Sequence, residues 1–368
     1  MWIILLSLCF IVGGPAMVWA DESGGNSYEM ELARPVPTVK QVDSSLPVFV
    51  PDSEKIEGEL FVECSLLVEP IVRRWATEFG SIYPNAKITA VPVDKNFDVA
   101  RITTRPETHV VLFEGSGSLT VALDGRRGEF SWPVIVGIDR VEIVVHPNNR
   151  IKELSVNEFA WIFSEQGASS PALKSEEKVF LEHPRIDDWK ELGRTNLPSF
   201  AQAPISVYRR QPFTDEDGFI KQQGSGGFWG DGFFGVRDRR ADARVVETPD
   251  DMIRAVNKDR YGMGYISHSL LSSKVRSVPV KGMPPSVRAS AERGSVPYLL
   301  NLPSLARPIY LWVTPSGEAA RPKLESEFIR FALSLQGQRA MSKEGFFPLP
   351  SPIAKIQLGA ALRISAPQ

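Results

Sequence analysis

Residues 58–93 carry the pattern that most restricts how this chain can fold. The segments ELFVECS and NAKITAVPV are short apolar runs of the kind that form strands. Between them lies LLVEPIVRRWATEFGSIYP, in which helical spacing relates Val68, Val72, Trp75 and Phe79. A strand, a helix and a strand joined by short connections favour parallel pairing of the two strands. The sequence therefore predicts an α/β fold that contains this unit.

The same alternation continues along the chain. HVVLF, RVEIVVH, ISVYRR and ARPIYLWVT predict further strands. KELSVNEFAWIFS predicts a helix whose start is capped reciprocally by Ser155 and Glu158. DDMIRAVNKDRYGMGYIS predicts a helix, a turn and a strand, and RPKLESEFIRFALSLQGQRAM predicts one helix. Because 368 residues exceed one ordinary core, two lobes are expected.

The first 20 residues, MWIILLSLCFIVGGPAMVWA, are typical of a secretory signal peptide that ends at Ala20. The absence of Lys and Arg near the start leaves an alternative, an uncleaved membrane anchor of about 20 residues. Gly13, Gly14 and Pro15 interrupt the apolar run and favour cleavage. Residues 21–57, rich in Pro, Ser and charge, predict a linker or tether. Removal of the leader leaves Cys64 without a partner for an intrachain disulfide.

Composition and motifs exclude several classes of function. The formal net charge of −2 argues against a nucleic-acid-binding protein, which usually carries a basic excess. The four histidines and the lone Cys64 show no metal-ligand spacing. The sequence contains no Walker loop, nucleophile elbow or HExxH motif. We therefore expect no enzymatic activity, no cofactor and no metal site.

Two strand-to-helix loops are candidates for holding an anion. Ser65 ends one strand and precedes a helix, so its hydroxyl can cap that helix, and the free amides there can attract an oxyanion. In VYRRQPFTDEDGFIKQ, residues 207–222, a strand and loop are expected to lead into a helix that begins near Thr214. The acidic residues 215–217 would stabilise that first turn without any ligand, and they would also repel an anion.

Several segments in a fixed order carry a resemblance to a known family. They are RVEIVVHPNNRIKELSVNEFAWIFS, DDWKELG, DRYGMGYIS, LARPIYLWV and FIRFALSLQGQRAMSKEGFFPLP. Through them the chain resembles, from about residue 58 to 350, the phosphate-type substrate-binding proteins of ABC importers, within the periplasmic binding protein superfamily.

This resemblance implies an α/β, two-lobed, type II periplasmic-binding-protein-like fold with a ligand-binding cleft between the lobes. Two crossover strands, at 140–146 and 307–313, would join the lobes. Lobe one would take residues 58–140 and 307–350, and lobe two residues 141–306. Residues 351–368 would form a C-terminal tail.

The resemblance also implies a site, which departs from the family pattern. Ser65 and Arg209 match a serine and an arginine of the family. Leu67 replaces a threonine, Phe213 and Asp215 replace two hydroxyl residues, and Glu114 replaces a serine. The expected ligand-binding residues are Ser65, Leu66, Glu114 and Ser116 from lobe one, and Arg209 and Thr214 from lobe two.

The function implied is that of an exported, periplasmic solute-binding protein. It would capture a small polar solute, phosphate or another oxyanion, for an ABC permease, with Glu114 changing the ligand preference. Membrane contact would come only through the permease or an uncleaved leader. The alternative is a ligand-free protein-interaction module that uses the Gly-aromatic loop GSGGFWGDGFFG, residues 224–235, because several exposed aromatic side chains would favour a partner.

Overall fold

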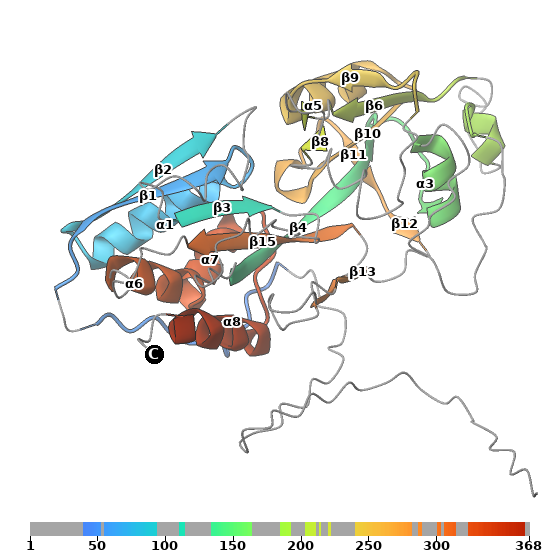
Figure 1. The fold of residues 1–368 in the computed structure, drawn as a ribbon. Coiled ribbons are helices and arrows are strands. Elements are labelled where there is room, and N and C mark those ends of the chain that lie inside the picture. Colours follow the sequence, from blue (N-terminus) through green and yellow to red (C-terminus); the bar gives the residue numbers. More distant parts are fainter. Residues whose placement is uncertain are drawn as a thin grey trace, which may run out of the picture.

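One mixed sheet of nine strands runs through both lobes of the molecule (Figure 1). The order of its main path is β2 (Ala86–Val93), β1 (Gly58–Ser65), β3 (Val110–Glu114), β15 (Ala306–Val313), β4 (Val134–Val145), β10 (Gly262–Ser267), β6 (Ser206–Arg210) and β9 (Arg244–Val246), and β11 (Arg276–Val278) pairs with β4. The computed structural model describes residues 40–52, 55–93, 110–114, 134–163, 185–192, 203–210, 213–214, 220–221, 240–281, 286–288, 300–302, 305–313 and 323–364.

The unit predicted at residues 58–93 is confirmed. β1 and β2 pair in parallel along their whole length, from Gly58 opposite Ala86 to Ser65 opposite Val93, and α1 (Glu69–Ile82) connects them. The predicted apolar stripe of α1 is buried because it covers the sheet, and the Trp75 indole donates a hydrogen bond to the carbonyl of Gly337, 2.8 Å away.

β4 is the strand that connects the lobes. It pairs with β15 as far as Arg140 and with β10 from Val141 onward. The same strand contributes Ile138 to the core of lobe one and Val141 to the core of lobe two. β4 begins at Val134, six residues before the expected crossover, because the apolar run VIVGIDRVEIVV is buried almost throughout.

The C-terminal helices of lobe one differ from the sequence-based expectation. The single helix predicted after residue 320 is two helices, α6 (Lys323–Ala332) and α7 (Leu335–Lys343). Ser334 separates them because its hydroxyl accepts the Gly337 amide and caps α7. Residues expected as a tail form α8 (Ser351–Ile364), which hydrogen-bonds to β4 through the side chain of Gln357.

The segment expected to be a linker also contributes to the core of lobe one. Leu46, Phe49 and Ile56 are buried in that core. The backbone amide of Phe49 donates to the Gln336 side chain, and the Leu335 amide donates to the carbonyl of Pro47. These apolar residues are scattered without a helical or strand period, so their packing in the core could not be predicted from composition.

Lobe two surrounds the other half of β4 (Figure 1). Its helices include α3 (Val156–Phe163), α5 (Pro249–Lys258) and the short turns η1 (Trp189–Leu192) and η3 (His268–Leu270). The predicted cap of α3 is confirmed, because the Glu158 amide donates to Ser155 Oγ and the Ser155 amide donates to Glu158. Small sheets pair β5 (Leu154–Ser155) with β12 (Val280–Lys281) and β13 (Ser286–Arg288) with β14 (Leu300–Leu302).

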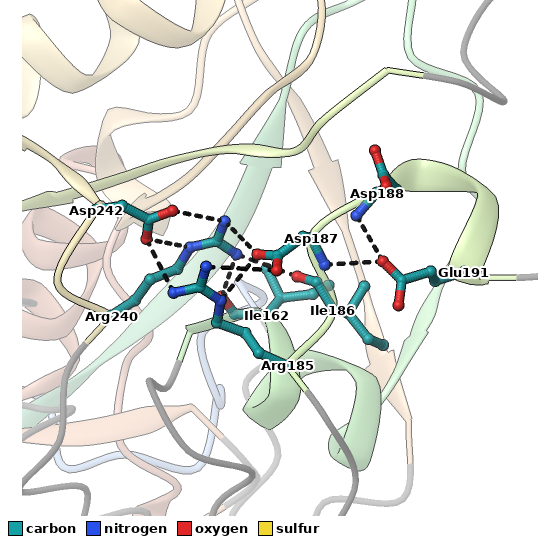
Figure 2. Close-up of polar contacts among 8 residues, drawn as sticks. All are labelled: Ile162, Arg185, Ile186, Asp187, Asp188, Glu191, Arg240 and Asp242. Carbon is teal, nitrogen blue, oxygen red and sulfur yellow. Dashed lines mark hydrogen bonds and ion pairs between the residues drawn. The ribbon is translucent and has the colours of Figure 1, made fainter.

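A network of charges lies in lobe two beyond α3 (Figure 2). Figure 2 shows the guanidinium of Arg240 between Asp187 and Asp242. Arg240 is buried, and its nitrogens lie 2.8 Å from Asp187 and 2.7 Å from Asp242. The same group donates to the carbonyls of Ile162 and Ile186. Arg240 therefore ties together the end of α3, the segment before η1 and the segment before β9.

The lobes also touch beside β4. Phe347 of lobe one exchanges two backbone hydrogen bonds with Ile138, and its ring lies 4.8 Å from the His268 ring of lobe two. Gly345 has φ of +87°, and a Cβ there would lie 2.9 Å from the backbone of Ser269. Only glycine fits this close approach without strain. Across the described ranges, no helix has the length and apolar character required to cross a membrane.

Candidate functional site

Polar residues from both lobes meet where β4 passes between them. Ser65 ends β1, Glu114 ends β3 and Ser267 ends β10. β1 and β3 are parallel, so their carboxyl ends lie at the same edge of lobe one. β10 is antiparallel to β4, which brings its carboxyl end back toward the same junction. In open α/β sheets, ligands bind at such carboxyl edges.

Ser65 does not cap α1, contrary to that part of the expectation. The N-cap of α1 is Val68, without a side-chain hydrogen bond. The Ser65 hydroxyl instead donates a hydrogen bond to the carboxylate of Glu114. Leu66 follows in the turn, with its side chain 51% exposed. The sequence therefore located the strand end correctly, but the partner of the hydroxyl comes from a strand 49 residues away.

Beside the contact of Ser65 with Glu114, a buried ion pair links β15 to β4. Arg307 of β15 donates to Asp139 of β4 from Nε at 2.8 Å and from Nη2 at 2.7 Å. The hydroxyl of Ser267, from lobe two, donates to the other oxygen of Asp139. Arg307 Nη2 also lies 3.9 Å from Glu114. One guanidinium thus serves two carboxylates, and the network joins residues of both lobes.

Sequence reasoning missed Asp139, Ser267 and Arg307. A signal was present, because Asp139 and Arg307 are charged residues inside apolar strand segments, VIVGIDRVEIVV and ARPIYLWV. Charged residues are almost never fully buried unless they are paired. Which two would pair could not be read from the sequence, because 168 positions separate them.

The electrostatics of the junction are dominated by burial. Complete burial raises the pKa of the Glu114 carboxyl; the charge of Arg307 and the hydrogen bond from Ser65 oppose this shift without cancelling it. Asp139, at 0% exposure, contributes a second negative charge nearby. The neighbouring thiol of Cys64 is buried as well, which raises its pKa to about 12 and keeps it neutral.

Arg209 lies on the lobe-two side of the junction. β6 runs parallel to β10 with Val207 opposite Met263, so Arg209 is near the same end of the sheet as Ser267. Strand alternation places Arg209 on the face of the sheet that carries Ser267 and Asp139. Its Nε is buried and has no hydrogen-bond partner among the described residues. A buried donor without a partner is costly, so such a group is suited to a ligand.

Thr214 does not begin a helix, and this part of the expectation is wrong. Residues Phe213–Thr214 form β7, which pairs antiparallel with β8 (Ile220–Lys221). Thr214 therefore lies in a strand pair rather than at a helix start. Phe213 and Thr214 agree with this pairing, because aromatic and β-branched residues favour strands. The lobe-two site consequently lacks the helix start predicted at Thr214.

Other predicted features lie outside the described residues. They are the leader 1–20, Ser116, the acidic residues 215–217 and the Gly-aromatic loop 224–235. Within the described part of the chain, no group of three or more His, Cys, Asp or Glu side chains could hold a metal ion.

Known proteins are similar to this chain in sequence and in fold. It is 24% identical over 328 residues to the phosphate-binding protein PstS of Pseudomonas aeruginosa, covering 86% of this chain and 91% of that protein. The crystal structure of an ABC-type phosphate transport receptor from Vibrio cholerae covers 79% of this chain and 100% of that one, with a TM-score of 0.53 and 16% identity. The ancestral soluble variant of the human phosphate-binding protein has a TM-score of 0.50 and 12% identity, covering 81% and 93%.

No protein-family model matches the sequence. The two-lobed α/β fold predicted from the motifs is confirmed by the solved structures. The chain is thus similar in sequence to the phosphate-binding protein PstS and in fold to an ABC-type phosphate transport receptor.

Proposed function

We propose that the protein is an exported solute-binding protein that captures a small polar ligand between its two lobes for an ABC importer. The ligand class is that of phosphate and other oxyanions, with an altered preference. The observation that supports this most directly is Arg209, a guanidinium at the lobe junction whose buried Nε has no partner among the described residues.

The described junction explains why the preference would differ from that of a simple oxyanion receptor. Its hydroxyl groups are engaged, since Ser65 donates to Glu114 and Ser267 donates to Asp139. Arg307 is engaged by Asp139 as well. An anion entering the junction would meet two buried carboxylates and one cation already shared between them. Arg209 Nε is a buried donor that a ligand could use without displacing a partner among the described residues.

The mechanism proposed is lobe closure without covalent chemistry. A ligand that contacts both lobes stabilises the conformation in which those contacts coexist, by the difference in its affinity for the two conformations. β4 and β15 join the lobes and would carry the hinge. The leader inferred from residues 1–20 would direct the chain outside the cytoplasm. The partner would be a permease, which we infer from the similarity to an ABC-type phosphate transport receptor.

Isothermal titration calorimetry with phosphate, sulfate and other small polar solutes tests this function. Arg209→Gln should weaken binding at least tenfold, since a lost hydrogen bond to a charged group costs about 1.5–3 kcal/mol. Arg254→Gln is the matched control, because Arg254 is an exposed arginine of the same lobe on α5. Equal affinity in both variants and the wild-type protein would remove Arg209 from the site, and heat-free titrations with every solute would refute the proposed function.

A further inference from the structure

The contacts of Glu114 are those that a bound oxyanion would make. One carboxylate oxygen accepts a hydroxyl hydrogen bond from Ser65 at the end of β1. The other lies 3.9 Å from the guanidinium of Arg307. The carboxylate sits at the carboxyl edge of the lobe-one strands, where a ligand of this fold is expected. Its side chain is 3% exposed, so solvent does not compete for these partners.

We propose that Glu114 acts as an internal anion, whose carboxylate takes the place of an oxyanion solute and occupies the Ser65 hydroxyl that the solute would otherwise use. This inference rests on the proposed function and names the residue that sets its specificity. Glu114 thereby excludes solute anions from the lobe-one half of the site, and the protein favours ligands that do not need the Ser65 hydroxyl.

Charge explains how strong the exclusion would be. Two like charges about 4 Å apart repel one another, and the repulsion is several times stronger near a protein surface than in bulk water. Arg307 offsets this repulsion only in part, because its Nε and Nη2 already donate to Asp139, whose carboxylate adds a second negative charge. At the effective dielectric near a protein surface the repulsion exceeds a factor of ten in affinity, so ionised Glu114 should weaken oxyanion binding at least about tenfold.

The exclusion should depend on pH through Glu114 itself. Among the described residues, the charged and titratable groups around it are Arg307 on β15, Asp139 on β4 and the thiol of Cys64 on β1. Burial raises the pKa of Glu114, so it becomes neutral at a higher pH than an exposed glutamate. A neutral Glu114 no longer repels an anion. Oxyanion affinity should therefore increase as the pH falls.

Sulfate is the appropriate probe, because it stays a dianion at both about pH 5 and about pH 8, whereas phosphate changes its own charge. Sulfate affinity of the full chain would be measured by calorimetry at both pH values for the wild type, Glu114→Gln and Glu114→Ala. Gln keeps the shape and an acceptor for Ser65; Ala also frees the hydroxyl. Glu59→Gln is the control, an exposed glutamate on β1 that pairs with Lys87.

At about pH 8 we expect both Glu114 variants to bind sulfate at least about tenfold more tightly than the wild type, with Glu59→Gln unchanged. At about pH 5 the difference in sulfate affinity between the Glu114 variants and the wild type should be smaller. Variants that keep wild-type circular dichroism but bind sulfate no more tightly than a sulfate-binding wild type would overturn the internal-anion role and leave the proposed function standing. If the wild type and both variants bind none of the solutes tested, the proposed function fails and this inference falls with it.

Discussion

Arg307 and Arg240 are both buried, at 1% and 5% side-chain exposure, and each faces two carboxylates. Their surroundings differ. The partners of Arg307, Asp139 and Glu114, are themselves 1% and 3% exposed. The partners of Arg240, Asp187 and Asp242, are 46% and 54% exposed, and two backbone carbonyls take the remaining hydrogen bonds.

The difference in exposure of the carboxylates distinguishes a cluster that holds segments together from a candidate functional site. The carboxylates around Arg240 can be hydrated, so this cluster holds three segments of lobe two together at little electrostatic cost (Figure 2). The carboxylates around Arg307 cannot be hydrated, so one cation must compensate two buried charges. Groups with strongly shifted pKa values gather at functional sites, although structural pairs also produce such shifts.

Substitution of each arginine should give the largest difference in unfolding free energy between the two clusters. Arg307→Met leaves Asp139 and Glu114 buried without their cation, which should cost about 3–5 kcal/mol of unfolding free energy. Urea denaturation followed by circular dichroism measures the loss. Combining it with Asp139→Leu should recover part of the loss, because the uncompensated charge is then gone. A single-variant loss below about 1 kcal/mol would contradict the burial of this pair.

A smaller effect is expected in lobe two. Arg240→Met frees carboxylates that water can reach but leaves the carbonyls of Ile162 and Ile186 without donors, so we expect a loss of about 1–3 kcal/mol. The same denaturation experiment applies, with Arg244→Met as control, an exposed arginine that pairs with Asp259. A loss as large as that of Arg307→Met would erase the proposed distinction between the clusters.

The smallest effects should appear as opposite responses to pH. The folded-state pKa of Glu114 is raised, so its contribution to stability falls as the pH rises from its unfolded value near 4.3 through the folded pKa. Glu114→Gln should therefore gain melting temperature relative to the wild type on going from about pH 4 to about pH 8.

Asp242 should respond in the reverse direction. The hydrogen bond from Arg240 lowers the pKa of Asp242, so its stabilisation is present above its unfolded value near 3.9 and is lost as the pH falls through the folded pKa. Asp242→Asn should be less stable than the wild type at neutral pH, with the difference closing in acid. Melting curves across the pH range would show whether the stabilities of the two variants, each relative to the wild type, change with pH in opposite directions. Changes in the same direction would contradict the contrast between the two clusters.

Several parts of the fold followed from local sequence. The stripe of α1 and the reciprocal cap of Ser155 and Glu158 were predicted and are confirmed, because the residues involved are neighbours in the chain. The division after α6 was not predicted. The helical period continues through Ser334, and its capping role becomes visible only where the helix ends.

The candidate site could be predicted from the sequence less completely than the fold. Ser65, Glu114 and Arg209 were identified as residues, and the structure joins the first two at the lobe junction and places Arg209 at the same end of the sheet. The helix start at Thr214 was wrong, since the pairing of β7 with β8 replaced it. The two strands are only two residues long, so their pairing could not be predicted from a periodic pattern.

The sequence by itself determined the β1, α1 and β2 unit and the capped start of α3, because spacing and capping act between residues close together in the chain. Only the tertiary structure decided that the Ser65 hydroxyl belongs to Glu114 and that Arg307 belongs to Asp139. Such pairs form when distant strands become neighbours in one sheet, and burial then makes their charges and hydrogen bonds costly to leave unmatched.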